Sequence, residues 1–335
     1  MKTLITVANE DLRQLVFREE AVWRLERVTE VDFVELGDDL TVAQLADRIA
    51  GYEAVLTSWR SPKLTQQVLE RADRLRFVGH AAGTVVPIVD PVIFDRDPET
   101  VVVNANSPLA RSTAELVMAL MMAGGWTLNR FADQMRRGVW RDVNQQTVIG
   151  LYGQTIGLIG YGEISREVIR LLQPFHATIL LCSRNCPEEE AASLGVQLCG
   201  LEELLRRSTI VSLHNTLTEK TQGMIGREQL ALMQDGALFV NTARGPIVQE
   251  QALLDELESG RLYAALDVFH AEPVQVDSPL LRLPNVVCTP HIGAMSRYWR
   301  GQLGETVIDE LIRFVNGEPL QGRITREKFA FLTPQ

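Results

Sequence analysis

QTIGLIGYGEIS, the sequence of residues 154–165, joins an apolar run to a turn rich in glycine. The run 154–159 suits a strand inside a parallel sheet, because both faces of such a strand are covered. A helical pattern follows the turn as far as about Pro174. Gly160 permits a tight turn, and Gly162 lets the backbone approach an anion at the helix N-terminus. The stretch therefore predicts a strand–turn–helix unit that can hold a phosphate group.

The turn resembles the glycine-rich turn of dinucleotide-binding folds, in which the pyrophosphate lies on the helix N-terminus. The third glycine of that pattern, which allows close packing of helix and strand, is replaced here by Ser165. Because serine is small, we expect the helix to stand off slightly and the site to be kept. A second strand, expected at 178–182, ends where the ribose-binding residue belongs. The turn residues expected to contact the cofactor are Gly160, Tyr161, Gly162, Glu163 and Ile164.

The end of the 178–182 strand bears on the choice between NAD and NADP. NAD-specific folds place Asp or Glu about 20 residues past the glycine turn, where it binds the ribose 2′-hydroxyl. This chain has Cys182-Ser183-Arg184 there, without an acid. Ser183 can hydrogen-bond a 2′-phosphate and Arg184 can pair with it. We expect NAD(P)(H) as the cofactor, with NADPH weakly preferred. If Arg184 points into solvent instead, both cofactors are accepted.

Further along the chain, three segments each follow an expected strand and each carry one ionisable residue of interest. They read NTARG at 241–245, DVFHAEP at 267–273 and TPHIG at 289–293. Ligands of an open parallel sheet bind beyond the carboxyl ends of its strands. Arg244, Glu272 and His291 are therefore delivered toward one edge of the sheet. Such a trio can bind an anionic substrate, move a proton and orient the proton carrier.

Taken together, these motifs resemble those of the D-isomer-specific 2-hydroxyacid dehydrogenases, which include phosphoglycerate dehydrogenase, D-lactate dehydrogenase and glyoxylate/hydroxypyruvate reductases. The resemblance covers most of the chain and is clearest from about Asn104 to Ala294. It implies that Arg244 binds the substrate carboxylate, that His291 carries the proton and that Glu272 orients His291. It also implies hydride transfer between NAD(P)(H) and a small 2-oxo acid or D-2-hydroxy acid.

The fold that we expect is α/β, with two Rossmann-like, doubly wound parallel-sheet domains. A chain of 335 residues can bury two cores. Strands and helices alternate over residues 1–108, but this part has no glycine-rich phosphate turn. The resemblance implies that the substrate-binding (catalytic) domain is discontinuous, formed by 1–108 plus 297–335. The dinucleotide-binding domain is expected at 109–296, with six strands.

The resemblance also assigns further contacts to each ligand. His214 and Asn215 should line the adenosine side, and Asp267 should bind the nicotinamide carboxamide. The other cofactor contacts that we expect beyond the glycine turn are Ser183, Arg184, Thr242, Ala243 and Gly293. Backbone N–H groups of the loop at Ala82 and Gly83 should bind the substrate carboxylate, and Trp59 or Arg60 should contact the variable end of the substrate.

The loop 83–88 departs from the family pattern. It reads GTVVPI, where the family usually has Gly-x-Asp-Asn-Ile-Asp. The identity of the 2-hydroxy acid is therefore left open, as is the physiological direction of the reaction.

Residues 112–137 form a helical pattern unusually rich in Met, Leu and Ala. Apolar residues occupy more than one face of this helix, and they are too many to form a single buried stripe. In the family this helix packs in a dimer interface. We therefore expect a homodimer through the 112–137 region.

Composition excludes several other classes of protein. Lys and Arg number 33 against 43 Asp and Glu, and a net charge of −10 argues against a nucleic-acid partner. No apolar run is long enough for a membrane span, and Met1–Ala8 reads as a strand rather than a signal peptide. The four cysteines show no C-x-x-C or zinc spacing, so we expect no metal and reduced thiols in a cytoplasmic protein. We expect no regulatory domain after Gln335.

Two alternatives remain open at this point. The family contains corepressors that keep the fold and sense dinucleotides, although the presence of Arg244, Glu272 and His291 together favours an enzyme. A dehydrogenase of the phosphite type is the other alternative. Formate enzymes of the family carry Gln in the place of Glu272, so this chain is unlike them.

Overall fold

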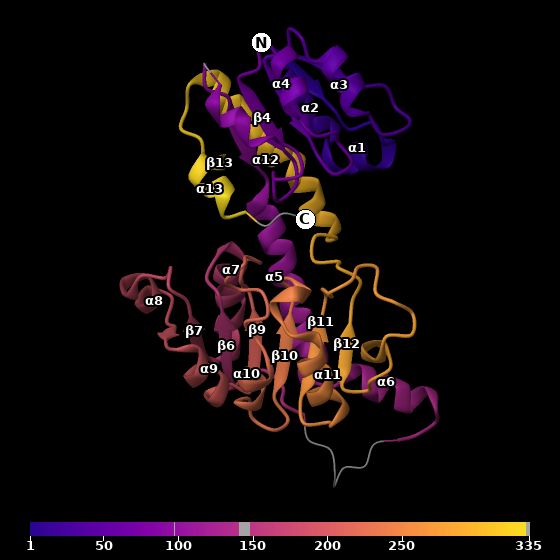
Figure 1. The fold of residues 1–335 in the computed structure, drawn as a ribbon, viewed down its shortest axis with the longest axis vertical. Helices are drawn as coiled ribbons and strands as arrows, with labels where there is room; N and C mark the ends of the chain where they lie inside the picture. The colour runs from indigo at the N-terminus through magenta and orange to yellow at the C-terminus, as the bar shows by residue number, and fades with distance from the viewer. Residues whose placement is uncertain (97, 141–147, 333–335) are drawn as a thin grey trace. The chain divides into compact units, whose positions relative to one another are not determined.

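The computed structural model of the protein describes residues 1–96, 98–140 and 148–332. The chain divides into two compact units, each with its own sheet and helices (Figure 1). The first unit comprises Met1–Leu109 and Met295–Gln335, and the second comprises Ala110–Ala294. The first unit is thus built from two separate stretches of sequence.

The sheet of the first unit has six strands among the described residues, in the order β13-β5-β4-β3-β1-β2. The neighbours pair in parallel, except that β13 runs antiparallel to β5. The strands are β1 (Lys2–Ile5), β2 (Glu30–Phe33), β3 (Ala54–Thr57), β4 (Phe77–His80), β5 (Val101–Asn104) and β13 (Arg323–Ile324). The helices are α1 (Glu10–Val16), α2 (Glu19–Glu26), α3 (Val42–Arg48), α4 (Gln66–Arg71), α12 (Arg297–Asn316) and α13 (Arg326–Ala330), with the 3-10 helix η1 (Pro91–Asp95).

Each face of this sheet is covered by its own helices, because successive side chains of a strand point to opposite faces. On one face, α3 and α4 pack over Leu4, Val55 and Val78. On the other face, α1, α2 and α12 pack over Ile5 and Leu56. Helix α12 contributes apolar residues three and four positions apart, which form one buried stripe: Leu303, Val307, Ile308 and Leu311.

The sheet of the second unit has seven strands within the described part of the chain, all parallel, in the order β12-β11-β10-β9-β6-β7-β8. The strands are β6 (Thr155–Ile159), β7 (Thr178–Cys182), β8 (Gln197–Leu198), β9 (Ile210–Leu213), β10 (Leu238–Asn241), β11 (Tyr263–Leu266) and β12 (Val286–Cys288). The helices are α5 (Asn106–Gly125), α6 (Leu128–Arg136), α7 (Glu163–Leu172), α8 (Glu188–Ser193), α9 (Leu201–Arg207), α10 (Arg227–Ala231) and α11 (Glu250–Glu258), with 3-10 helices η2 (Gln173–Phe175), η3 (Gly245–Ile247) and η4 (Pro279–Leu281).

The second sheet is also doubly wound. Helices α5, α7 and α8 pack on one face, over Leu158, Leu181 and Val240. Helices α9, α10 and α11 pack on the other, over Ile159 and Phe239. The expectation of two Rossmann-like parallel-sheet domains is confirmed, and the loops after the strands of each sheet lie at its carboxyl edge.

Several elements differ from the sequence prediction. The helix expected over 112–137 is two helices, α5 and α6, separated at Thr127, whose φ of 46° is left-handed. Gly124 and Gly125 directly precede this break, and glycine weakens a helix interior. The short strands β8 and β13 were not predicted, because two residues carry no periodic pattern and their pairing is long-range.

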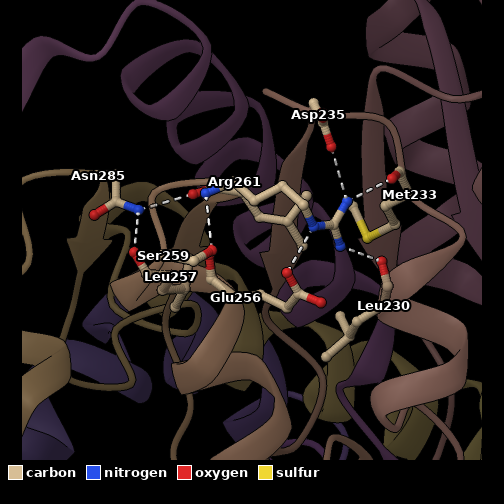
Figure 2. A network of polar contacts seen from close by, with 9 residues as sticks. Leu230, Met233, Asp235, Glu256, Leu257, Ser259, Arg261 and Asn285 are labelled. Carbon is tan, nitrogen blue, oxygen red and sulfur yellow. Dashed lines mark hydrogen bonds and ion pairs between the residues drawn. The ribbon is translucent and has the colours of Figure 1, made fainter.

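A network of hydrogen bonds and ion pairs links the residues before β11 and β12 to α10 and α11, at the amino edge of the second sheet (Figure 2). The Arg261 guanidinium donates to the carbonyls of Leu230 and Met233, each at 2.7 Å, and to the Glu256 carboxylate at 2.6 Å. Asn285 donates to the carbonyls of Leu257 and Leu262. These bonds satisfy carbonyls at the ends of α10 and α11, so we assign the network a structural role.

Within the described ranges, none of the helices combines the length and the apolar character that crossing a membrane requires.

Candidate active site

The glycine turn connects β6 to α7 in the second unit. Gly160 has a φ of 103°, a conformation that favours glycine. A Cβ at Gly160 would also lie 2.8 Å from the backbone nitrogen of Asn215, so no side chain fits there. The Gly160 N–H donates to the Cys182 carbonyl at 2.9 Å. The turn is therefore held tightly between the ends of β7 and β9.

Ser165, in the place of the third glycine, is fully buried and has a specific local role. Its hydroxyl accepts a hydrogen bond from the Gly162 N–H at 2.7 Å and donates to the Gly162 carbonyl at 3.0 Å. The hydroxyl thus caps the first turn of α7. The next N–H groups of that turn have no acceptor inside the helix, which is the usual anion site of a helix N-terminus.

The residues after β9 are buried polar groups without protein partners. Both ring nitrogens of His214 and the Oδ1 atom of Asn215 are buried and accept or donate no hydrogen bond among the described residues. Burial lowers the pKa of His214 to about 4, so the ring is neutral near pH 7. Buried polar atoms are normally paired. Their position beside the glycine turn fits a ligand with polar groups, such as a dinucleotide.

The two residues expected to read the ribose, Ser183 and Arg184, follow β7. The Ser183 hydroxyl accepts a hydrogen bond from the Asn185 N–H at 3.0 Å, which closes a short turn. Arg184 is exposed, and no hydrogen bond or ion pair holds its guanidinium within the described part of the chain. The exposed guanidinium is available to a phosphate group, and its exposure also matches the alternative in which both cofactors are accepted.

Arg244 stands in the loop after β10, which is shaped by Asn241 and Gly245. The Asn241 side chain accepts from the Ala243 N–H and donates to the Arg244 carbonyl. A Cβ at Gly245 would lie 2.1 Å from the carbonyl carbon of Phe269. Glycine is thus required for this loop to touch the loop after β11, and the contact brings Arg244 toward Glu272.

The Arg244 guanidinium is partly buried and donates to the Ala243 carbonyl at 2.7 Å. Burial lowers the pKa of Arg244, and the negative charge of Glu272 opposes this shift. Arginine nevertheless stays charged at any pH at which the protein folds. A half-desolvated cation of this kind is well suited to a carboxylate ligand.

Asp267 organises the loop that carries His291. Its buried carboxylate accepts hydrogen bonds from the Thr289 hydroxyl at 2.6 Å, the Ile292 N–H at 2.8 Å and the Gly293 N–H at 3.0 Å. Sequence reasoning assigned Asp267 to the nicotinamide carboxamide and missed these bonds, because no local pattern indicates an acceptor for N–H groups so far along the chain. The Ser112 hydroxyl of α5 donates to the Gly293 carbonyl at 2.5 Å and holds the loop from the other side.

His291 and Glu272 form the central pair. The His291 Nδ1 atom lies 2.7 Å from Glu272 Oε2, and the other oxygen of Glu272 accepts from the Phe269 N–H at 3.0 Å. His291 has a φ of 53°, which is rare for a residue other than glycine and costs energy unless the surroundings impose it. The side chain of His291 is 47% exposed, and its Nε2 atom has no partner among the described residues. The pair can therefore present one ring nitrogen to a substrate.

In the first unit, the loop after β4 contains the residues expected to bind the substrate carboxylate. The Ala82 N–H already donates to the His80 carbonyl at 2.8 Å, whereas the Gly83 N–H has no acceptor within the described ranges. Asn104 donates to the Gly83 carbonyl at 2.6 Å and fixes its orientation. Of the two residues, Gly83 is thus the one with an available donor.

The loop after β3 holds Trp59 and Arg60. Arg60 has a φ of 65°, and its guanidinium forms an ion pair with Asp39 at 2.8 Å. Trp59 is partly buried, with the Arg300 guanidinium 5.3 Å from the centre of its ring. The neighbouring Ser58 hydroxyl donates to the Ala81 carbonyl at 3.0 Å and ties this loop to the one after β4.

Comparisons with known proteins identify the family of the chain. The family model for the NAD binding domain of D-isomer specific 2-hydroxyacid dehydrogenases matches residues 118–293. The chain is 37% identical to the D-3-phosphoglycerate dehydrogenase of Methanocaldococcus jannaschii, covering 94% of this chain and 60% of that protein. It is 35% identical to the glyoxylate reductase of Korarchaeum cryptofilum, covering 82% of this chain and 83% of that protein.

Among solved structures, a protein of Thermus thermophilus superposes with a TM-score of 0.76 at 30% identity, covering 97% of this chain and all of that one. The chain spans about 60% of the length of the phosphoglycerate dehydrogenases that it matches. The resemblance seen in the motifs is confirmed by the family model and by these relatives. The chain belongs to the D-isomer specific 2-hydroxyacid dehydrogenase family.

Proposed function

We propose that the protein is an oxidoreductase that interconverts a small 2-oxo acid and the D-2-hydroxy acid with NAD(P)(H). The observation that carries this proposal is the 2.7 Å bond between His291 and Glu272, with Arg244 held beside the same loop by Gly245. A proton carrier, its orienting carboxylate and a carboxylate-binding cation are the groups that this reaction needs.

The residues fit a dinucleotide. The N-terminus of α7 would hold the pyrophosphate, and the unpaired atoms of His214 and Asn215 would face the adenosine side. Thr242, Ala243 and Gly293 lie in loops at the same edge of the sheet and complete the proposed contacts. When bound, the nicotinamide supplies a hydride to C2 of the substrate or accepts one from it.

In the reduction, the Nε2 atom of His291 donates a proton to the oxygen on C2, and in the oxidation it takes that proton back. Glu272 accepts from Nδ1, which fixes the orientation of the ring and stabilises the imidazolium. Arg244 binds the substrate carboxylate and stabilises the charge that develops on the C2 oxygen. In the first unit, the resemblance to the family points to the Gly83 N–H as a donor for a substrate carboxylate, and to Trp59, rather than the ion-paired Arg60, as a contact of the variable end.

NADPH is the preferred form of the cofactor in this proposal. Arg184 is exposed and unpaired among the described residues, and no acid stands beside it to repel a 2′-phosphate. Ser183 offers a hydroxyl next to it. The preference rests on a surface charge, so it amounts to a bias rather than an exclusion of NADH.

A homodimer is also proposed. The apolar residues of α5 on which the sequence prediction of an interface rested are buried in the core of the second unit instead, Val117, Met118, Leu120 and Met121 among them. Helix α6 has no buried residue, and large apolar side chains on it and near it are exposed: Met122, Trp126, Leu128, Met135, Val139 and Trp140. Apolar patches of this kind commonly mark protein interfaces. Light scattering at a micromolar protein concentration should give twice the mass of the monomer. The Met135→Glu variant should give the mass of the monomer. A monomer in the unchanged protein would contradict this assignment.

The test of the proposed activity uses the purified full chain. Oxidation of NADPH, followed by its near-ultraviolet absorbance, should accelerate with glyoxylate, hydroxypyruvate, pyruvate or phenylpyruvate. A dinucleotide-sensing protein would bind NADPH and turn over none of them. An enzyme of the phosphite type would reduce NADP with phosphite and ignore the 2-oxo acids. Either result would overturn the proposal.

A further inference from the structure

Two cysteines face each other across the edge of the second sheet. Strands β7 and β8 pair in parallel, with Leu180 opposite Gln197 and Leu181 opposite Leu198. The next pair in this register is Cys182 and Cys199. The Cys199 N–H donates to the Leu181 carbonyl at 3.1 Å, so the pairing of the two backbones continues to this position.

Both thiols lie on the same face of the sheet. Leu181 and Leu198, one residue earlier on each strand, pack into the cluster under α7 and α8. Cys182 and Cys199 instead pack against the opposite cluster, under α9 and α11. Directly opposed residues on neighbouring strands are about 4.8 Å apart, which falls inside the Cα separation of about 4.4–6.8 Å that a disulfide spans.

The pair adjoins the proposed cofactor site. The carbonyl of Cys182 accepts the Gly160 N–H of the glycine turn, and the ribose-reading residues Ser183 and Arg184 follow directly. Both cysteines are partly exposed, so a small oxidant can reach them. A bond between the two sulfurs would join β8 to the residue that supports the glycine turn.

We propose that Cys182 and Cys199 form a reversible disulfide that lowers the affinity of the protein for its dinucleotide. With a hydroperoxide as oxidant, one thiolate attacks the peroxide oxygen to give a sulfenic acid, and the alcohol or water leaves. The second thiolate attacks that sulfur, the S–S bond forms, and water leaves. The two thiols lose two electrons and two protons, and the peroxide is reduced. The effect on affinity rests on the proposed function, whereas formation of the bond does not.

The surroundings of the two thiols determine how the rate of their oxidation depends on pH. Burial raises the pKa of Cys182, and the charge of Arg184 opposes that shift. Burial also raises the pKa of Cys199, and the negative charges of Glu203 and of an ionised Cys182 raise it further. The positive charge of Arg207 opposes this shift. The thiolate is the reactive form, so oxidation is slow near pH 7 and becomes faster toward about pH 9.

The first experiment maps the bond in the folded full-length protein. After treatment with hydrogen peroxide, peptides separated without reductant should show Cys182 linked to Cys199. The link should be absent in Cys199→Ser and in Cys182→Ser. It should persist in Cys186→Ser, the matched control, because Cys186 is buried in the cluster on the other face of the sheet. Sulfinic acids without a link, or a link that needs denaturant, would overturn the proposal.

The second experiment measures NADPH binding by fluorescence before and after oxidation. The dissociation constant should rise at least about 3-fold in the oxidised protein, return with dithiothreitol, and stay constant in Cys199→Ser. An unchanged constant in protein with the mapped disulfide would refute the effect on affinity. If the reduced protein binds no dinucleotide at all, the proposed function is wrong. The first experiment still tests formation of the disulfide in that case, because it does not depend on dinucleotide binding.

Discussion

Gly245 lies against the backbone of Phe269 so closely that a Cβ on Gly245 would be 2.1 Å from the Phe269 carbonyl carbon. Real Cβ atoms do not come this close to backbone atoms, so any side chain forces the loops after β10 and β11 apart. The first loop carries Arg244, and the second carries Glu272. Their relative position therefore depends on the absence of a side chain at residue 245.

Gly245→Ala should lower kcat/KM for a 2-oxo acid by roughly 100-fold or more, because a displacement of about 1 Å at a catalytic group costs that much. The measurement is steady-state kinetics together with circular dichroism, to show that the variant is folded. Gly200→Ala is the control, because a Cβ there meets nothing within 4 Å and its φ of −71° suits any residue. Equal activity of both variants would separate Gly245 from the site.

His291→Asn tests the proton carrier with little strain on the backbone, since Asn tolerates the φ of 53° better than most residues. The variant should lose roughly 100-fold or more in kcat, which is the usual contribution of general acid–base catalysis. NADPH binding, measured by fluorescence, should be unchanged. A variant with normal turnover would exclude His291 as the proton carrier.

Arg244→Lys should raise KM for the 2-oxo acid and also lower kcat. Lysine keeps the charge but not the planar pair of donors that matches a carboxylate. Part of the interaction strengthens as charge develops on the C2 oxygen, which is why kcat falls as well. Arg227→Lys, at an exposed ion pair with Asp255, is the control and should leave both constants unchanged. If Arg244→Lys behaves like this control, Arg244 lies outside the site.

Much of this arrangement could be predicted from local sequence. The strand predicted at 178–182 has the expected bounds, because a buried parallel strand forms a clear apolar run. The convergence of Arg244, Glu272 and His291 follows from the topology of the sheet, since each residue comes after a strand of the same parallel set.

Features that depend on tertiary contacts could not be predicted in this way. The role of Asp267 as an acceptor for the Ile292 and Gly293 N–H groups exists only once β11 and β12 are neighbours. No pattern in the sequence indicates that the Ser165 hydroxyl caps α7 through its hydrogen bonds with Gly162. The pairing of Cys182 with Cys199 likewise appears only through β8, which is too short to recognise in the sequence.

Two buried histidines make stability depend on pH. Burial lowers the pKa of His80 to about 3 and that of His214 to about 4, from an ordinary value of 6.5. The two histidines bind a proton more readily in the unfolded chain than in the folded protein. Protonation therefore favours unfolding, so the folded state keeps its full stability above about pH 6.5 and loses stability as the pH falls. The free energy of unfolding should drop by about 2 kcal/mol per histidine between pH 7 and pH 5.

Urea unfolding at both pH values measures this drop. His214→Asn should show a smaller decrease than the unchanged protein, since one of the two groups is gone. His176→Asn is the control, because His176 is exposed and its φ of 50° suits Asn. If the free energy of unfolding decreases equally in the wild type and in His214→Asn, His214 does not contribute to the pH dependence of stability.

Arg184 is the residue on which cofactor choice should depend. It is exposed, no acid stands in the positions that read the ribose, and a 2′-phosphate can pair with its guanidinium. A charge-assisted bond of this kind contributes about 1–3 kcal/mol, so kcat/KM should favour NADPH over NADH by roughly 10-fold or more. Arg184→Ala should remove most of that advantage and leave the NADH constants nearly unchanged.

Arg206→Ala is the control and should change the kinetic constants of neither cofactor. Arg206 is an exposed arginine in the last turn of α9, at the opposite edge of the sheet. Measuring both cofactors on all three proteins decides the assignment: an unchanged protein that prefers NADH, or equal losses with both cofactors in Arg184→Ala, would mean that the ribose is read elsewhere.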